Sequence, residues 1–204
     1  MIGIINYGVG NIKAFENIYR KLYVPVKILS SIDDFDNVTH LILPGVGSFD
    51  HAMIAFHKSG MKEITDDFVL NKKLPVLGIC VGMQMLSKTS EEGVEPGLCW
   101  IDGVVKKFDE SKIRMATHLP HMGWNDLEIK NQTPLFLDFP TMAPFYFLHS
   151  YYFDCQNKDD IIAETEYGIY FTCAIQHNNI FGIQCHPEKS HFYGIKLLEN
   201  FSKI

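Results

Sequence analysis

A cysteine between two glycines is the feature of this sequence that most constrains its fold. Residues 74–86 read Leu-Pro-Val-Leu-Gly-Ile-Cys-Val-Gly-Met-Gln-Met-Leu, with Cys80 between Gly78 and Gly82. A short apolar run that ends in a turn signal predicts a buried strand, and the residues after it are compatible with a helix start. Glycines two positions to either side of the cysteine let neighbouring backbone approach without a Cβ clash. The segment therefore predicts a strand, a sharp turn carrying Cys80, and a helix.

Cys80 is the candidate nucleophile of the chain. A helix N-terminus directly after it would supply positive potential and free N–H groups, which favour the thiolate over the thiol and can hold an oxyanion. The alternative is that Cys80 is a small buried hydrophobic residue, which is a common fate of free cysteines. The short pattern leaves both interpretations open.

The composition is that of one compact domain. The chain has 204 residues, of which 47% are hydrophobic and 21% charged, so we expect a single domain over residues 1–204. The net charge of -6 argues against a general nucleic-acid binder. Proteins or small molecules are the expected partners.

The five cysteines are scattered and lack C-x-x-C spacing, so they indicate neither a disulfide framework nor a zinc site. They are Cys80, Cys99, Cys155, Cys173 and Cys185. The chain begins Met-Ile-Gly-Ile-Ile without a basic leader, and no apolar run approaches the roughly 18 residues that a bilayer span needs. We expect a cytoplasmic protein in a reducing compartment, with no membrane segment.

Strands alternate with helices in the first half of the chain. Strands are predicted at 2–6, 24–29, 41–47 and 76–79, with helices after the first strand, after residue 48 and over 60–71. Ser48 or Asp50 is the expected cap of the second helix. This alternation predicts a mostly parallel central sheet with helices on both faces and a site beyond the carboxyl ends of the strands.

After residue 88 the helical periodicity fades, which predicts β-hairpins and loops. The apolar runs there are Trp100–Phe108, Ile113–Met115 and Trp124–Ile129. An aromatic strand interrupted by His149-Ser150 is predicted over 144–153, and further strands are predicted near 161–166, 170–176 and 180–184. A last helix from His191 should bury Ile195, Leu197, Leu198 and Phe201. The predicted fold class is α/β, with an antiparallel, β-rich second half.

Two glycines after the first strand allow a second interpretation of the N-terminus. Gly8 and Gly10 match the opening of a dinucleotide-binding fingerprint, but Lys13 stands where the third glycine should be. A tight turn is the simpler interpretation. A nucleotide-binding module is the alternative.

A cysteine nucleophile needs a base, and the base needs an orienting group. His186-Pro187-Glu188 follows a predicted strand, and residues i and i+2 of an extended segment project to the same face. Pro187 biases His186 toward the extended region, so the Glu188 carboxylate can lie beside the imidazole. We therefore favour His186 as the base. His121 and His149 are expected in loops around the site.

Gly-Ile-Cys-Val-Gly-Met-Gln at 78–84 and His-Pro-Glu at 186–188 resemble the class I (triad) glutamine amidotransferases. Four further motifs, and a longer stretch that includes His186-Pro187-Glu188, resemble, among these, the glutaminase subunits of imidazole glycerol phosphate synthase. The four lie at 6–11, 43–49, 120–125 and 149–151, and the longer stretch is 184–190. Cys185 departs from the phenylalanine that is usual in the family, and we interpret it as a packing change.

The resemblance implies a flavodoxin-like fold and a role for each matching residue. Cys80, His186 and Glu188 would form the catalytic triad, and the backbone N–H groups of Val46 and Val81 would hold the oxyanion. The residues that would surround bound L-glutamine are Gly45, Gly47, Gln84, Ser150 and Tyr151. The residues that would meet a partner subunit are Asn11, His121, Met122 and Trp124, with Trp124 exposed in a polar loop. No cofactor and no metal are implied.

The family's partner subunit is a (β/α)₈ barrel that uses the ammonia in histidine biosynthesis. The resemblance thus implies a heterodimer that contacts neither nucleic acid nor membrane. Two alternatives share the fold and the cysteine. One is a paralogous glutaminase that feeds another synthase, such as one aminating a sugar nucleotide, and the other is a free-standing cysteine hydrolase.

Overall fold

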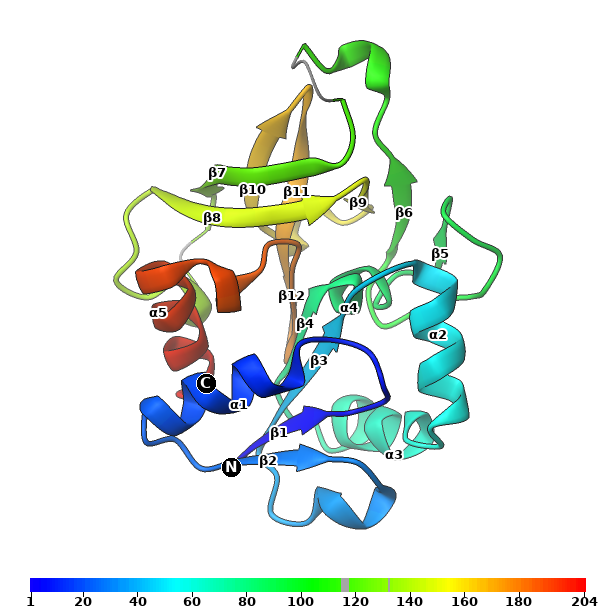
Figure 1. Ribbon diagram of the computed structural model, residues 1–204, viewed down its shortest axis with the longest axis vertical. Helices are drawn as coiled ribbons and strands as arrows, with labels where there is room; N and C mark the ends of the chain where they lie inside the picture. The colour runs from blue at the N-terminus through cyan, green and yellow to red at the C-terminus, as the bar shows by residue number, and fades with distance from the viewer. Residues whose placement is uncertain (115–117, 132) are drawn as a thin grey trace.

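The computed structural model describes residues 1–114, 118–131 and 133–204, and within them twelve strands form one mixed sheet (Figure 1). The main strand order is β2-β1-β3-β4-β12-β11-β10-β7-β8, and β5, β6 and β9 join it through the pairing of β9 with β11. The strands are β1 (Ile2–Ile5), β2 (Val26–Leu29), β3 (His40–Gly45), β4 (Val76–Cys80), β5 (Thr89–Ser90), β6 (Gly103–Lys107), β7 (His121–Ile129), β8 (Met142–His149), β9 (Tyr151–Cys155), β10 (Ile161–Tyr167), β11 (Ile169–His177) and β12 (Ile180–Ile183).

The helices are short and lie mostly in the first half and at the end of the chain. The α-helices are α1 (Ile12–Lys21), α2 (Phe49–Lys58), α3 (Lys62–Asp66), α4 (Val81–Gln84) and α5 (His191–Phe201). A π-helical turn, η2 (Asp67–Asn71), continues α3. The 3₁₀ turns are η1 (Ile32–Phe35), η3 (Glu110–Lys112), η4 (Pro134–Phe136), η5 (Lys158–Asp160) and η6 (Pro187–Lys189). None of the helices in the described ranges combines the length and apolar character that a membrane crossing needs.

The parallel part of the sheet runs from β2 through β1, β3 and β4 to β12. The chain moves outward from β1 to β2 through α1 and inward from β3 to β4 through α2 and α3. Because such crossovers are right-handed, opposite directions of travel place the helices on opposite faces. Figure 1 shows α1 and α5 on one side of the sheet and α2 and α3 on the other. The predicted fold class is confirmed.

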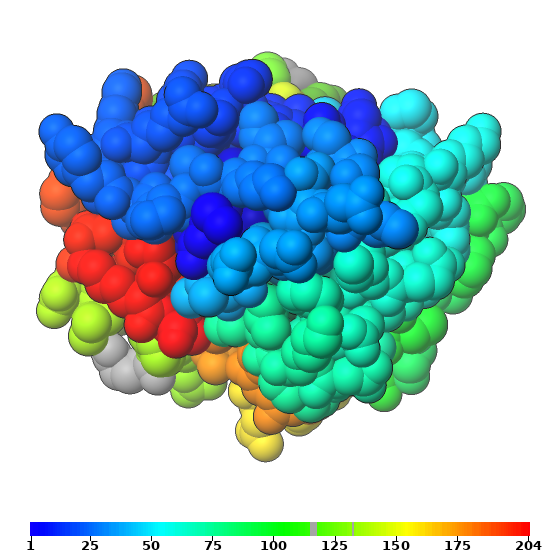
Figure 2. Space-filling model, turned by 90° about the horizontal axis from the view of Figure 1, so that it is seen from below, coloured from blue at the N-terminus to red at the C-terminus, as the bar shows by residue number. Residues whose placement is uncertain are grey.

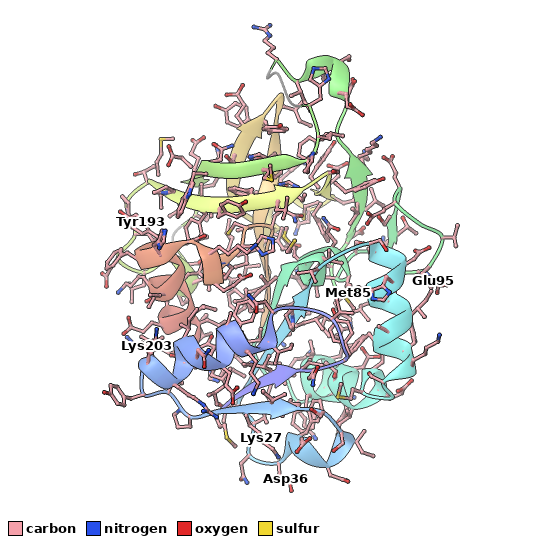
Figure 3. All side chains as sticks on the ribbon, viewed as in Figure 1. Lys27, Asp36, Met85, Glu95, Tyr193 and Lys203 are labelled. Carbon is pink, nitrogen blue, oxygen red and sulfur yellow. The ribbon has the colours of Figure 1, made fainter. Side chains whose placement is uncertain are left out.

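Burial on both faces explains why the central strands are apolar along their whole length. Every residue of β1, β4 and β12 is buried, as expected for parallel strands covered by helices. Met85, just after α4, lies in the interior beside α2 (Figure 3). Figure 2 views the molecule from below, where α1 and β2 (blue) lie beside the end of α5 (red).

The antiparallel part follows the alternation that one buried face dictates. Along β8, buried Ala143, Phe145 and Phe147 alternate with outward-facing residues. β7 pairs with β8 along its length, from His121 opposite His149 to Glu128 opposite Met142. One face of this hairpin therefore joins the core, and the other carries exposed and half-exposed side chains.

Several local predictions are corrected by long-range contacts. The second strand begins at Val26 and not at residue 24. The aromatic strand is interrupted as predicted, but only at Ser150, which separates β8 from β9, because His149 still belongs to β8. Ile195 is 42% exposed because α5 turns Leu197, Leu198 and Phe201 to the core instead. His121, Trp124 and His149 lie in strands and not in loops. The end of the predicted run Ile113–Met115 lies outside the described residues.

Candidate active site

Cys80 lies at a strained turn between β4 and α4. Its φ of 56° and ψ of -114° are unusual for a residue with a side chain. A Cβ on Gly82 would lie 2.0 Å from the Leu43 carbonyl oxygen, and one on Gly78 would lie 2.6 Å from the Gly82 carbonyl oxygen. The steric reason predicted for the two glycines is confirmed. α4 begins directly after Cys80 but has only four residues.

The turn after β3 lies against the turn that carries Cys80. Gly45 is the register partner of Cys80, and a Cβ on Gly45 would lie 2.4 Å from the Gly82 nitrogen. The Tyr7 hydroxyl, which is buried, donates a hydrogen bond of 2.5 Å to the Pro44 carbonyl. The N-terminal glycine turn thus packs on this loop.

Gly10 supplies the second part of that packing. Its φ is +105°, and a Cβ there would lie 2.8 Å from the Pro44 side chain. Gly8 has open space around it but a φ of +90°, so both glycines of the predicted tight turn have a structural reason for lacking side chains that involves no nucleotide.

His186 and Glu188 form a buried pair at the end of β12. The His186 Nδ1 atom lies 3.0 Å from Glu188 Oε1, and the two side chains are 5% and 3% exposed. The predicted proximity is confirmed, but its cause differs, because residues 187–189 form the 3₁₀ turn η6 and not an extended segment.

The electrostatics of the pair favour a protonated imidazole. Burial by itself lowers the pKa of His186, but the nearby Cys80 thiol and the Glu188 carboxylate outweigh it and raise that pKa to about 10. The His186 Nε2 atom is buried and has no hydrogen-bond partner among the described residues. That nitrogen is therefore available to a proton or a ligand at the Cys80 thiol.

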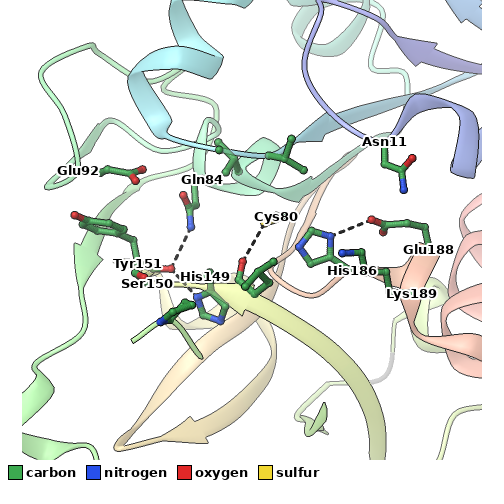
Figure 4. Close-up of a pocket in the computed structure, with 15 residues that line it drawn as sticks. Asn11, Cys80, Gln84, Glu92, His149, Ser150, Tyr151, His186, Glu188 and Lys189 are labelled. Atoms are coloured by element: carbon green, nitrogen blue, oxygen red, sulfur yellow. Dashed lines mark hydrogen bonds and ion pairs between the residues drawn. The ribbon is translucent and has the colours of Figure 1, made fainter. Parts of the chain in front are cut away.

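These groups line a cavity of about 420 Å³ (Figure 4). Its size lies within the range of small-molecule sites. Its lining includes most of the residues predicted to be catalytic or to surround a ligand: Val46, Gly47, Cys80, Val81, Gln84, Ser150, Tyr151, His186 and Glu188. Asn11, predicted at the partner surface, also lines it. Gly45 supports the turn from behind without lining the cavity.

Glu92 is a lining residue that the sequence did not point to. Its Oε2 atom accepts a hydrogen bond of 2.8 Å from the Phe49 N–H, the first of α2. Ser48 occupies the predicted N-cap position of α2, but its side chain makes no capping hydrogen bond. The Asp50 carboxylate instead accepts from the N–H groups of Val94 and Glu95. Burial and, secondarily, Asp50 raise the pKa of Glu92 above its ordinary value. A remote loop thus delivers a carboxylate to the cavity wall.

A row of side-chain amides lies behind the thiol. The Gln84 Nε2 atom donates to the Tyr151 carbonyl at 3.1 Å and to Gln184 Oε1 at 3.0 Å. The Gln184 Nε2 atom lies 3.7 Å from Cys80 Sγ. Gln84 therefore uses both of its N–H bonds within the protein, which leaves its oxygen for a ligand.

Two buried histidines continue from the Tyr151 carbonyl to the outer strand. His149 Nδ1 lies 2.8 Å from that carbonyl, and His149 Nε2 lies 3.0 Å from His121 Nδ1. Burial is the main cause that lowers the pKa of His149 to about 3, and burial lowers that of His121 to about 4. His121 is 3% exposed, stacked between Phe147 and Tyr167. The prediction that His121 meets a partner is corrected: it lies behind the surface and not on it.

The outward face of the β7–β8 hairpin is apolar and reaches the cavity. Met122 is 61% and Trp124 50% exposed, and they pair across the strands with Leu148 and Tyr146. Trp124 stacks on His191, and Leu148 lines the cavity. An exposed apolar patch of this kind marks an interaction surface.

The polar groups of the cavity do not form a metal site. Within the ranges that the structure describes, no group of three His, Cys, Asp or Glu side chains could hold a metal ion. The arrangement offers a thiol, a paired imidazole and two turns whose backbones lie against each other, which is a set for acyl transfer through a thioester.

Comparisons with known proteins extend over the whole chain. The family model of glutamine amidotransferase class I matches residues 4–203. The chain is 50% identical over 204 residues to the imidazole glycerol phosphate synthase subunit HisH of Bdellovibrio bacteriovorus, covering 100% of each chain. It is 46% identical over 204 residues to the protein of the same name from Leptospira interrogans, again covering 100% of each.

The fold is also shared with solved structures at low sequence identity. A structure described as a glutamine amidotransferase superposes with a TM-score of 0.74 at 15% identity, over 100% of this chain and 99% of that one. At so low an identity the likeness concerns the fold alone.

Proposed function

The chain belongs to the class I glutamine amidotransferases and, within them, to the family of the imidazole glycerol phosphate synthase subunit HisH; from this premise we propose that it is the glutaminase subunit of such a synthase. It hydrolyses glutamine to glutamate and ammonia, and it passes the ammonia to a synthase subunit of histidine biosynthesis. The single observation that carries the chemistry is one cavity lined by Cys80, His186 and Glu188.

The first half of the reaction forms a thioester. The Cys80 thiolate attacks the side-chain carboxamide carbon of glutamine, and the carbonyl oxygen takes the negative charge. The C–N bond then breaks as His186 delivers its proton to the departing nitrogen, which leaves as ammonia. The raised pKa of His186 supports this role, because the imidazole holds the proton until the leaving group needs it.

The second half hydrolyses the thioester. His186, now neutral, takes a proton from water as the water oxygen attacks the γ-glutamyl carbon. The C–S bond breaks, glutamate leaves, and the thiolate–imidazolium pair is restored. Glu188 orients the ring in both halves through the contact of 3.0 Å to Nδ1.

The N–H groups of Val81 and Val46 hold the oxyanion in this proposal. They belong to the two turns that contact each other through Gly45 and Gly82. Val46 lines the cavity from a turn whose next residue, Gly47, has a φ of +86°. A glycine at that position lets the peptide reorient when substrate binds.

The charges that line the cavity indicate where the α-amino end of glutamine binds. Glu188 is engaged by His186, so Glu92 is the lining carboxylate left to meet the α-ammonium group of glutamine. Gln84 Oε1, Ser150 and Tyr151 complete the amino-acid end of the cavity. Each of these groups matches a polar feature of glutamine.

The partner is a (β/α)₈ synthase subunit, and it docks on the β7–β8 face. Free ammonia becomes protonated and diffuses away in water, so a covered route must begin where the cavity opens. Leu148 belongs to both the cavity and the outward face, and Met122 and Trp124 extend that face. A buried aromatic anchor is typical of such interfaces.

The test uses the purified protein with and without the synthase subunit. Wild-type protein should release ammonia and glutamate from glutamine, and Cys80→Ala should lower this turnover by about 10⁴-fold or more. The same variant should leave the synthase reaction with ammonium salt intact. Retained glutamine use by Cys80→Ala would refute the mechanism.

The acceptor of the ammonia is tested separately. Ammonia is the same product whatever the acceptor, so a paralogous glutaminase would behave alike in the first assay. Isolation of the bound synthase from the native host, followed by assay for imidazole glycerol phosphate formation, separates the two. A synthase that aminates a sugar nucleotide would contradict the histidine assignment but leave the glutaminase chemistry standing.

A further inference from the structure

Gln184 is a buried polar residue that the mechanism above leaves unused. It follows β12 directly, and β12 pairs with β4 so that Ile183 lies opposite Ile79. Gln184 thus lies beside Cys80 on the neighbouring parallel strand, with its side chain fully buried. Its Nε2 atom is 3.7 Å from Cys80 Sγ, a hydrogen-bond distance for sulfur.

A main-chain carbonyl fixes which end of the Gln184 amide faces the sulfur. The Tyr151 carbonyl can only accept, so the Gln84 amide must present its nitrogen to it. The second N–H of that nitrogen then points to Gln184 and demands an oxygen there, at 3.0 Å. Gln184 therefore has its oxygen toward Gln84 and its N–H groups toward Cys80.

The same carbonyl is held from its other side. His149 donates to it through Nδ1–H, so His149 Nε2 must accept from His121 Nδ1–H. His121 Nε2 in turn faces the Asn125 amide nitrogen at 3.3 Å. Each hydrogen bond in this series then has one defined direction from donor to acceptor, and both imidazoles are neutral. The Tyr151 carbonyl receives two donors and is thereby fixed in place.

The remaining neighbours of the thiol explain why a donor matters. The Leu148 carbonyl lies 4.0 Å from Cys80 Sγ and can accept only from the protonated thiol. A buried thiolate needs donors, because hydrogen bonds to a charged form favour that form. Protonated His186 brings a positive charge to the same cavity, but its Nε2 atom has no hydrogen-bond partner among the described residues, so Gln184 is the residue placed to donate.

We propose that Gln184 is a catalytic residue whose side-chain N–H donates to Cys80 Sγ and stabilises the thiolate, with Gln84 and the Tyr151 carbonyl fixing its direction. The proposal deepens the proposed function, because it rests on Cys80 as the nucleophile. A purely structural Gln184 would support packing but would leave the ionisation of the thiol unchanged.

The experiment measures the rate of Cys80 alkylation by iodoacetamide against pH in the purified protein, with the labelled cysteine identified by mass spectrometry. Gln184→Met removes the donor at similar volume, and Gln184→Glu replaces it with a charged acceptor. A hydrogen bond to a charged group corresponds to about a 10- to 100-fold change in ionisation. The alkylation profile of Gln184→Met should therefore move to higher pH by about one to two pH units. The profile of Gln184→Glu should move further, because the carboxylate also repels the thiolate.

The matched control is Gln176→Met, an amide on β11 whose Nε2 binds the Asn178 carbonyl, remote from the thiol. Its profile should equal that of the wild type. Three titratable groups interact electrostatically with Cys80, namely His186, Tyr7 and Cys185, and all three are unchanged in every variant.

A wild-type alkylation profile in either Gln184 variant, with folding verified by circular dichroism, would overturn the proposal. The two substitutions differ in charge and polarity, so the one that folds carries the test if the other does not. Glutamine turnover is not the readout. Failure of the glutaminase assignment would appear as a wild-type chain without glutamine activity, whatever the alkylation profiles show.

Discussion

His186 Nδ1 and Glu188 Oε1 lie 3.0 Å apart in a region where both side chains are almost fully buried. The pair is local in sequence but is completed by Cys80, which arrives on a different strand. Glu188 Oε2 has no hydrogen-bond partner among the described residues. The carboxylate is thus free to act on the imidazole alone, and its charge is the property to remove first.

Replacing Glu188 by glutamine should make the protonated form of His186 less stable without changing the shape of the site. Loss of the carboxylate charge lowers the pKa of His186 from its raised value toward the ordinary one, so the proton is lost at lower pH. We expect kcat for glutamine hydrolysis to fall about 10²-fold. The basic limb of the kcat profile should move to lower pH.

The control for Glu188→Gln is Glu199→Gln. Glu199 lies on α5 away from the cavity, and its replacement removes an ion pair with Lys203. The measurement is kcat for glutamine hydrolysis by the wild type and both variants over the range of about pH 6 to about pH 10. An unmoved basic limb in Glu188→Gln would show that the carboxylate does not control His186.

Glu92→Gln should affect binding and not chemistry. The glutamine oxygen can still accept from the Phe49 N–H, so the start of α2 remains capped. The charge that meets the α-ammonium group is lost, and about 1.5–3 kcal/mol of charge-assisted hydrogen bonding is at stake. We expect KM for glutamine to rise about 10- to 100-fold with kcat nearly unchanged.

Glu91→Gln is the matched control, because Glu91 precedes Glu92 but accepts from the Lys107 N–H outside the cavity. Its KM should equal that of the wild type. A Glu92→Gln enzyme with unchanged KM would place the α-ammonium group elsewhere.

Trp124→Ala should weaken docking of the synthase subunit. Trp124 is half exposed on the outward face of β7 and stacks on His191 at a ring-centre distance of 5.3 Å, so its ring is already oriented for a partner. Truncating a central aromatic anchor costs about 2 kcal/mol or more, which is a Kd increase of about 30-fold. Calorimetric titration of the two subunits measures it.

Tyr23→Ala controls for loss of an exposed aromatic ring. Tyr23 is 95% exposed beyond α1, at the end of the sheet opposite the cavity. Its Kd should be unchanged. Equal Kd values for Trp124→Ala and the wild type would exclude the β7–β8 face as the docking surface.

Sequence reasoning succeeded where the determinants are local. The apolar run, the two glycines and the cysteine of 74–86 define a strand and a turn by steric rules that act within a few residues, and the structure has both. The tripeptide 186–188 likewise brings base and carboxylate together in either an extended or a 3₁₀ conformation. The alternation of short apolar runs with helical periodicity identified the parallel strands.

Contacts between distant segments were beyond such reasoning. Glu92 reaches the cavity by capping a helix that begins 43 residues earlier. His121 and His149 meet because β7 pairs with β8 in one register, so two histidines expected in loops lie instead at the paired ends of two strands. The pairing of β12 with β4, which places Gln184 beside Cys80, likewise cannot be predicted from the spacing of apolar residues.

The buried histidine pair makes the stability of the fold depend on pH. His121 and His149 are neutral in the folded protein down to about pH 4 and about pH 3, respectively, because burial lowers both pKa values. In the unfolded chain each imidazole binds a proton below about pH 6.5. Between about pH 6.5 and about pH 4 the unfolded state therefore binds more protons, and stability falls as the pH falls.

His121→Gln tests this directly, because a glutamine amide can still accept from Asn125 and donate to His149 but does not titrate in this range. Each fully protonated imidazole of the unfolded state contributes about 1.4 kcal/mol per pH unit to the slope. The free energy of unfolding in urea, measured at about pH 5, 6 and 7, should thus vary less steeply in His121→Gln by up to that amount. If His121→Gln kept the slope of the wild type, the imidazole at 121 would have to bind a proton in the folded protein as readily as in the unfolded chain. The one-way series of hydrogen bonds from Asn125 to the Tyr151 carbonyl could then not persist at low pH, because a charged ring has no acceptor to offer.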